Sequence, residues 1–230
     1  TVIELAGALG EMKKYILPKD YPELDFTKMR IYLFEASPSI LRGMSRASVL
    51  AVLGYLRKLG VEVRLNSMVK DYDGLKVVLD DGSALFTRTL IWAAGVTCDP
   101  VRGLDDAVYG RGRRIVTDAS NRVKGYGNIF AIGDIALTPT EKYPEGHPQV
   151  APVAIHQARL LARNLKKLQE GKALRPFRYI DKGTLATVGQ NRAVAELPGI
   201  RLKGISAWLL WTFVHLMSIV GVKNRFFIFT

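Results

Sequence analysis

Two apolar strands with a helix between them constrain the fold of this chain more than any other feature. Residues 29–36 ("MRIYLFEA") form a short apolar and aromatic run that predicts a buried strand ending in an acid. A loop follows, then a helix with apolar residues at helical spacing that ends at Gly60, and then "VEVRLNS" alternates as a second strand. The next segment predicts a β-meander with an Asp-Gly turn. This order predicts an α/β fold, specifically the second half of a dinucleotide-binding domain with its crossover appendage.

The rest of the chain predicts further elements of both kinds. Two very apolar segments, "TLIWAAG" (89–95) and "NIFAIGD" (128–134), predict strands, and residues 150–170 predict a long helix ended by Gly171. An apolar stripe predicts a helix over residues 3–16 that stops near Pro18. Residues 177–197 predict a hairpin that turns at 189–191.

The charge is unevenly distributed along the chain. Most of the net charge of +12 comes after Arg159, where only Glu170, Asp181 and Glu196 oppose the basic residues. A basic C-terminal third suits either nucleic acid or an anionic membrane. Its aromatic residues lie in an uncharged segment (204–222) with basic residues on both sides, which favours a membrane surface and argues against nucleic acid.

Cysteine usage restricts the chemistry further. Cys98 is the only cysteine, so an internal disulfide and a Cys-x-x-Cys dithiol are both excluded. The sequence also shows no metal-ligand cluster, no Ser/His/Asp group and no pair of catalytic carboxylates.

Two acids follow predicted strands, where α/β proteins bind nucleotides. Glu35 is placed to accept hydrogen bonds from the hydroxyls of an adenosine ribose, and its charge would repel a 2′-phosphate, which favours NAD(H) over NADP(H). Gly133 and Asp134 end the segment 128–134. The glycine permits close approach of a ligand, and the carboxylate can hold a sugar or ribityl hydroxyl.

The chain resembles the type II NADH dehydrogenases, which are single-subunit, non-pumping NADH:quinone oxidoreductases. The resemblance is carried, in order, by "VIELAGAL", "TLIWAAGV", "NIFAIGDIA", "VAPVAIHQARLLARNL" and "WLLWTFVHLMSIVGVKNR". It implies a Rossmann-like fold of two dinucleotide-binding domains, FAD as cofactor, NADH as donor and a membrane quinone of the respiratory chain as acceptor. It also implies monotopic attachment to the bilayer surface, on the cytoplasmic side that holds NADH, and leaves a homodimer open.

The resemblance also implies roles for individual residues. Catalytic positions would be Glu4, close to nicotinamide and flavin, together with His156 and Lys182 near the quinone. Cofactor-binding positions would be Glu35, Ala94, Gly95, Gly133, Asp134, Ala151, Pro152 and Val153. The start of the helix after Gln149 would face the pyrimidine edge of the flavin with its positive dipole end.

The sequence departs from the family at three positions. Val2 occupies the place of the last glycine of the nucleotide-binding Gly-x-Gly-x-x-Gly turn, where a side chain would push the helix away from the sheet. In the family's Ala-Gln-x-x-x-Gln frame, Pro152 replaces the first glutamine and His156 stands at the second. Proline cannot donate a hydrogen bond to a quinone carbonyl, whereas histidine can donate a hydrogen bond or a proton.

The resemblance predicts a domain division as well. Residues 1–89 would form an N-terminally truncated NAD(H)-binding domain, 90–178 the second part of an FAD-binding domain, and 179–230 a hairpin with a membrane-anchoring segment. No Gly-x-Gly-x-x-Gly motif is present in the sequence, so we expect a fragment that is active only in the full-length protein. Two alternatives remain open: a soluble NADH-dependent flavoprotein of the pyridine nucleotide-disulfide type, and an inactive NAD(H)-binding, membrane-associated fragment.

Overall fold

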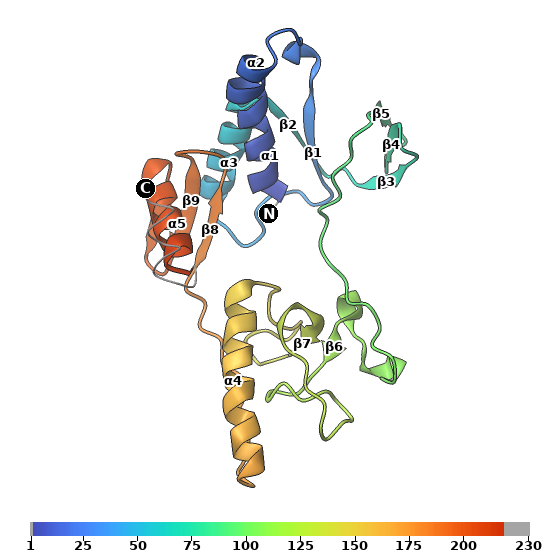
Figure 1. Ribbon diagram of the computed structural model, residues 1–230, viewed down its shortest axis with the longest axis vertical. Coiled ribbons are helices and arrows are strands. Elements are labelled where there is room, and N and C mark those ends of the chain that lie inside the picture. The colour runs from blue at the N-terminus through green and yellow to red at the C-terminus, as the bar shows by residue number, and fades with distance from the viewer. Residues whose placement is uncertain (1, 219–230) are drawn as a thin grey trace. The chain divides into compact units, whose positions relative to one another are not determined.

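The chain divides into two compact units, which we describe separately. The computed structural model describes residues 2–218 (Figure 1). Unit 1 comprises Thr1–Ala94 together with Lys182–Thr230, and unit 2 comprises Gly95–Asp181.

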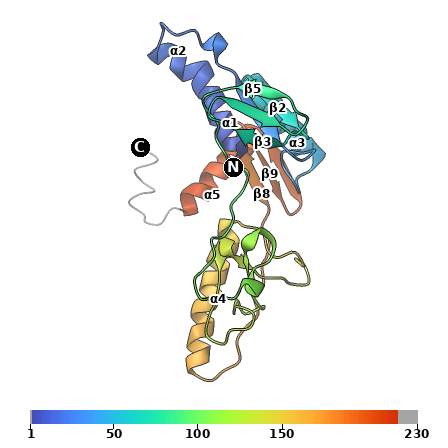
Figure 2. The ribbon, with the colours of Figure 1, turned by 90° about the vertical axis from the view of Figure 1, so that its right-hand side faces the viewer.

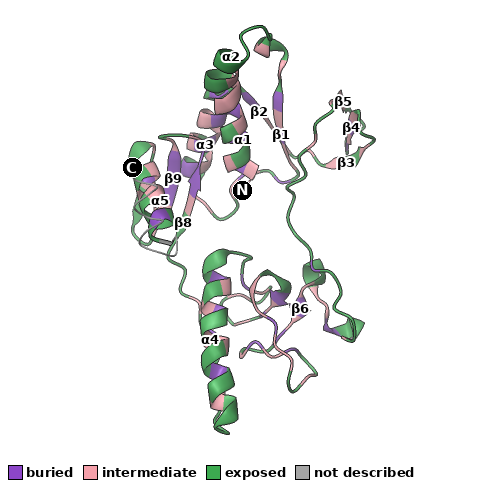
Figure 3. Cartoon of the chain, in the orientation of Figure 1, coloured by how far each residue is buried: buried purple, intermediate pink, exposed green. Residues whose placement is uncertain are grey.

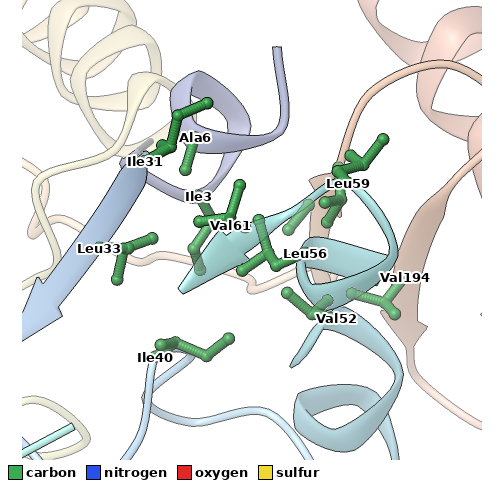
Figure 4. Close-up of a cluster of buried hydrophobic side chains, with 12 residues drawn as sticks. Ile3, Ala6, Ile31, Leu33, Ile40, Val52, Leu56, Leu59, Val61 and Val194 are labelled. Atoms are coloured by element: carbon green, nitrogen blue, oxygen red, sulfur yellow. The ribbon is translucent and has the colours of Figure 1, made fainter. Parts of the chain in front are cut away.

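The predicted strand–helix–strand motif forms the centre of unit 1. Strand β1 (Ile31–Glu35) pairs in parallel with β2 (Val61–Leu65), and helix α3 (Arg46–Lys58) connects them. Apolar side chains from several elements meet between helices and strands (Figure 4). The buried members of this cluster are Ile3, Ala6, Ile31, Leu33, Ile40, Val52, Leu56, Leu59, Val61, Ala186, Val188 and Val194. A parallel pair with a helical crossover is the expected arrangement of a dinucleotide-binding domain.

The first helix is longer than the sequence predicts. Helix α1 (Val2–Glu11) continues through the π-helical segment η1 (Met12–Ile16) into α2 (Leu17–Asp20), as Figures 1 and 2 show. The helix was predicted to stop near Pro18, and it passes through this proline and ends at Asp20. Proline is tolerated in a first helical turn, where its missing N–H would have no partner, and the π segment places Pro18 in the first turn of α2.

Helix α1 approaches its neighbours closely at two glycines. A Cβ at Gly7 would lie 3.0 Å from the carbonyl carbon of Val188, and one at Gly10 would lie 2.9 Å from the Cβ of Leu59. Val2 packs against the edge of the buried cluster. The close contacts of this helix occur at Gly7 and Gly10, about one and a half and two turns after Val2.

The predicted β-meander is confirmed. Strands β3 (Val69–Tyr72), β4 (Lys76–Leu79) and β5 (Ala84–Phe86) form an antiparallel sheet in that order. Asp73 accepts hydrogen bonds from the backbone N–H groups of Leu75 and Lys76 at the first turn. These hydrogen bonds lower the pKa of Asp73, because they stabilise the ionised carboxylate.

Both very apolar segments that predicted strands were assigned wrongly. Residues 88–94 have no regular structure, and Trp92 is 65% exposed. In residues 128–135, Phe130 makes an isolated bridge with Arg122, and Gly133–Ile135 forms the 3₁₀ turn η5. A strand needs a neighbour for its backbone hydrogen bonds, and no sheet within residues 2–218 includes either segment.

The C-terminal part of unit 1 is a three-stranded antiparallel sheet with a helix on it. Strands β8 (Thr184–Thr187), β9 (Ala193–Leu197) and β10 (Ile200–Lys203) pair in the order β10–β9–β8, which confirms the predicted hairpin. Helix α5 (Ile205–Ser218) packs against β9 (Figure 2). Among the described residues, no helix has the length and apolar character needed to cross a bilayer. The predicted anchoring segment extends past Ser218, and that portion lies outside the described residues.

A glutamate on this sheet is hydrogen-bonded to the N-terminus of helix α3. Glu196 on β9 accepts hydrogen bonds from the backbone N–H of Ser45 (2.9 Å), from the Ser45 hydroxyl, and from the Ser48 hydroxyl (2.6 Å). Ser45 is the N-cap of α3. These hydrogen bonds, led by those from the Ser45 and Ser48 side chains, lower the pKa of Glu196. The carboxylate also complements the positive end of the α3 dipole.

We expect Glu196→Ala to lower the free energy of unfolding by about 1 kcal/mol at pH 7, since solvent screens much of the charge contribution. The folded-state pKa of Glu196 is lowered, so its contribution is present above pH 4.5 and is lost as the pH falls through the folded-state value. Urea denaturation at pH 7 and at pH 3 tests this. An equal difference between the two proteins at both pH values would contradict it.

Unit 2 contains one long helix and short irregular elements. Strands β6 (Ile115–Val116) and β7 (Ala136–Leu137) pair in parallel, and the 3₁₀ turns η3 (Asp106–Val108) and η4 (Arg111–Arg113) precede them. Its apolar cluster consists of Val108, Ile115, Val123, Ala131 and Ala136. Helix α4 (Ala151–Gln169) confirms the predicted helix and is exposed over most of its surface (Figure 3).

Candidate functional site

The carboxylate at the end of β1 lies in a small polar cluster. Oε1 of Glu35 accepts hydrogen bonds from the backbone N–H (2.8 Å) and the hydroxyl (2.7 Å) of Ser37, and Nη2 of Arg42 lies 4.0 Å from the same oxygen. All of these contacts involve Oε1, so Oε2 remains available as an acceptor. The carboxyl ends of parallel strands are where open α/β sheets bind ligands. The cluster therefore presents a fixed acceptor at the expected place for a nucleotide ribose.

In unit 2, the turn at Gly133 and Asp134 is held by two amide side chains. Oε1 of Gln157 accepts from the backbone N–H of Gly133 (2.7 Å), and Nε2 of Gln149 donates to the carbonyl of Asp134 (3.0 Å). Gly133 has φ of 73°, a conformation that favours glycine. The side chain of Asp134 is exposed. The turn is thus fixed through its backbone while its carboxylate remains free to contact a ligand.

The N-terminus of α4 lies beside this turn and has no side-chain cap. Its N-cap residue, Val150, provides no side-chain hydrogen bond, and the first turn contains Pro152 and no acidic residue. Ala151 and Pro152 are exposed, and Val153 is buried. Uncapped N–H groups and the helix dipole favour an electron-rich ligand group at such an end.

A buried polar network supports the turn from behind. Gln157 is 1% exposed, and its Nε2 donates to Oγ1 of Thr138 (3.2 Å). The hydroxyls of Thr138 and Thr117 lie 2.7 Å apart, and Nδ2 of Asn121 lies 3.3 Å from the same Thr138 oxygen. Both Oε1 and Nε2 of Gln157 are therefore hydrogen-bonded. No role is predicted for Gln157 from the sequence, although a glutamine on the same buried helix face as Val153 and Asn164 is a signal of a buried polar contact.

A second buried group in unit 2 is a histidine enclosed by aromatic rings. His147 is 2% exposed and its ring packs against Tyr143, Phe177 and Tyr179 at centroid distances of 4.5, 4.9 and 6.0 Å. Nε2 of His147 lies 3.2 Å from the Thr140 hydroxyl. Burial lowers the pKa of His147, and the nearby charge of Arg114 lowers it further.

We expect unit 2 to lose stability on mild acidification through His147. Its folded-state pKa is lowered from 6.5, so the unfolded chain takes up a proton first and stability falls as the pH decreases below 6.5. The loss should grow as the pH falls from 6.5 toward the lowered folded-state value. Hydrogen exchange of unit 2 amides between pH 7.5 and 5.5, corrected for intrinsic rates, measures it. If His147→Phe shows the same loss, another group is responsible.

The other predicted site residues lie apart from these clusters. In unit 1, Glu4 is in the first turn of α1, Ala94 is exposed at the end of an irregular segment, and Lys182 is exposed just before β8. In unit 2, Gly95 is exposed, and His156 on α4 is half-buried with its ring 6.0 Å from that of Tyr179. The structure thus brings together Gly133, Asp134 and the first turn of α4. Roles for the other residues remain predictions.

The residues of unit 2 fit part of a flavin. An exposed carboxylate on a fixed turn suits the ribityl hydroxyls, and an uncapped helix N-terminus without acidic residues suits the electron-rich pyrimidine edge. A glycine-rich turn for the pyrophosphate is not among the residues described, so the fit covers the ribityl and ring portions only.

Comparisons with known proteins give the family of the chain. Residues 1–158 match the pyridine nucleotide-disulphide oxidoreductase family, and residues 182–230 match the NDH2 C-terminal domain. The type II NADH:quinone oxidoreductases Ndh and NdhA of Mycobacterium tuberculosis are 34% and 32% identical to this chain. The matches cover 98% of the chain and 50% and 49% of those proteins. The chain therefore spans about half the length of the curated relatives it matches.

A solved structure shares the fold. The structure of NDH2 from Plasmodium falciparum in complex with NADH superposes with a TM-score of 0.85 at 17% identity, covering 97% of this chain and 61% of that one. With both family matches, the chain belongs to the pyridine nucleotide-disulphide oxidoreductases and, among them, to the type II NADH:quinone oxidoreductase (NDH2) family.

Proposed function

We propose that the full-length protein that contains this chain transfers electrons from NADH through FAD to a membrane quinone without pumping protons. The observation that carries the proposal is the Gly133–Asp134 turn held beside the uncapped N-terminus of α4. The names of the relatives support the same donor and acceptor. Because the chain spans about half of those relatives, we assign the activity to the full-length protein only.

Unit 1 would bind NADH. Glu35, oriented by Ser37, would accept hydrogen bonds from the ribose hydroxyls of the adenosine half. Glu4, in the first turn of α1, would lie close to the nicotinamide and the flavin. Ala94 and Gly95 carry little or no side chain, so the backbone at these positions would allow a nucleotide or flavin to pass close by.

Unit 2 would hold the ribityl and ring portions of FAD. Asp134 would accept hydrogen bonds from the ribityl chain, and Ala151, Pro152 and Val153 would present the first turn of α4 to the pyrimidine edge. Bound FAD supplies the two-electron chemistry that connects a hydride donor with a quinone. The positive end of α4 would stabilise negative charge that develops at this edge.

The quinone would reach the protein from the bilayer. The face of α5 that is not packed on β9 exposes Ile205, Leu209, Phe213 and Met217, spaced four residues apart. These exposed apolar side chains would contact the bilayer surface. His156 could donate a proton or a hydrogen bond to the quinone, and Lys182 is the second candidate.

The full-length protein, purified in detergent, tests the proposal. We expect oxidised-flavin absorbance and NADH-dependent reduction of a soluble quinone analogue. Asp134→Ala should lower the bound flavin content severalfold, while Asp99→Ala, another exposed carboxylate of unit 2, should not. A colourless protein that binds NADH would overturn the enzyme assignment in favour of a binding module. Full solubility and activity without detergent or lipid would favour a soluble reductase.

A further inference from the structure

Glu35, the carboxylate that we propose binds the ribose, has a cationic neighbour, Arg42, for which the sequence predicted no role. Nη2 of Arg42 lies 4.0 Å from Oε1 of Glu35, and the two side chains are 75% and 31% exposed. Arg42 is not hydrogen-bonded to the carboxylate at this distance, whereas Ser37 is. The guanidinium is therefore near the carboxylate without being fixed to it.

The position of Arg42 matters because NADH and NADPH differ at one group, the ribose 2′-phosphate. A carboxylate beside the ribose repels that phosphate, and an arginine there binds it in a bidentate manner. Here both groups are present at the end of the same strand. The arginine partly neutralises the carboxylate, so repulsion of a 2′-phosphate is weaker than Glu35 alone would give.

A second arginine nearby is arranged differently. The guanidinium of Arg64 lies over the rings of Tyr32 and Phe34, at 5.2 and 5.9 Å from their centroids. Arg64 pairs in register with Phe34, one residue before Glu35, so its side chain points to the opposite face of the sheet. Arg42 is thus the arginine associated with the carboxylate.

We infer that Arg42 is a latent 2′-phosphate-binding residue, and that the Glu35–Arg42 pair, not Glu35 alone, sets the discrimination between NADH and NADPH. The inference rests on the proposed function, which places the adenosine ribose at the end of β1. It adds a specificity-determining residue: removal of the Glu35 charge releases a cation that is already positioned for the 2′-phosphate.

The test measures dissociation constants and kcat/KM for NADH and NADPH in the full-length protein and four variants: Glu35→Gln, Arg42→Gln, the double variant, and Arg64→Gln. Glu35→Gln should lower the preference for NADH by about tenfold or more, and Arg42→Gln should raise it by about fivefold. The double variant should lose most of the NADPH affinity that Glu35→Gln gains. Arg64→Gln removes the same charge in the same unit and should leave the preference within about twofold.

Two outcomes would overturn the inference in different ways. A double variant that binds NADPH as well as Glu35→Gln does would show that Arg42 takes no part, while leaving the NADH site intact. A wild-type protein that binds neither dinucleotide would overturn the proposed function itself, and the inference with it.

Discussion

Replacing Gln157 with leucine is expected to lower the stability of unit 2 by about 3 kcal/mol and to release the Gly133 turn. Leucine has a similar volume but cannot accept from the Gly133 N–H or donate to Thr138. Gln157 is almost fully buried, so water cannot readily replace it as a partner for either group. A buried donor left without an acceptor costs the full desolvation penalty of that group.

Amide hydrogen exchange at Gly133, followed together with thermal unfolding, measures both effects. Gln169→Leu provides the matched control, because it makes the same change on the same helix at an exposed position. Protection at Gly133 should fall in the first variant and persist in the second. Equal protection in the two variants would show that the turn does not depend on Gln157.

Local sequence patterns predicted most of the secondary structure but not all of it. The strand–helix–strand motif, the meander, the hairpin and α4 were all predictable, because periodicity and turn residues are local signals. The segments 89–95 and 128–134 have the composition of buried strands but do not form them among the described residues. Composition reports whether a segment suits burial in a sheet, whereas a strand also requires a partner with free backbone groups.

Contacts between residues far apart in the chain could not be predicted either, because local patterns do not identify distant partners. Glu196 caps a helix about 150 residues earlier in the chain, and no sequence pattern near Ser45 indicates that Glu196 is its partner. Glu35 and the Gly133–Asp134 turn could be predicted as candidates because each ends its own apolar segment. Ser37 and Arg42 lie within seven residues of Glu35, so their proximity was available to sequence reasoning, but the rotamers that bring Arg42 to 4.0 Å were not.

The second large expected effect is on the stability of unit 1, where helix α1 approaches its neighbours closely at Gly10. We expect Gly10→Ala to lower the free energy of unfolding of unit 1 by about 2 kcal/mol, although alanine is the better helix former. A Cβ at Gly10 would lie 2.9 Å from the Cβ and 3.1 Å from the carbonyl oxygen of Leu59, and 3.2 Å from Cγ2 of Val61. Leu59 is itself buried, so either α1 or the end of α3 must shift.

Gly54 provides the control, since it lies inside α3 and a Cβ there would meet nothing within 4 Å. Gly54→Ala should therefore raise stability by about 0.5–1 kcal/mol, which is the ordinary gain of alanine over glycine in a helix. The opposite signs separate packing from propensity, because the backbone change is the same in both variants. Urea denaturation followed by tryptophan fluorescence of Trp208 and Trp211, both in unit 1, measures the pair. A gain in stability for Gly10→Ala would mean that α1 can move away from Leu59 at little cost, and the parallel strand pair would then not depend on this contact.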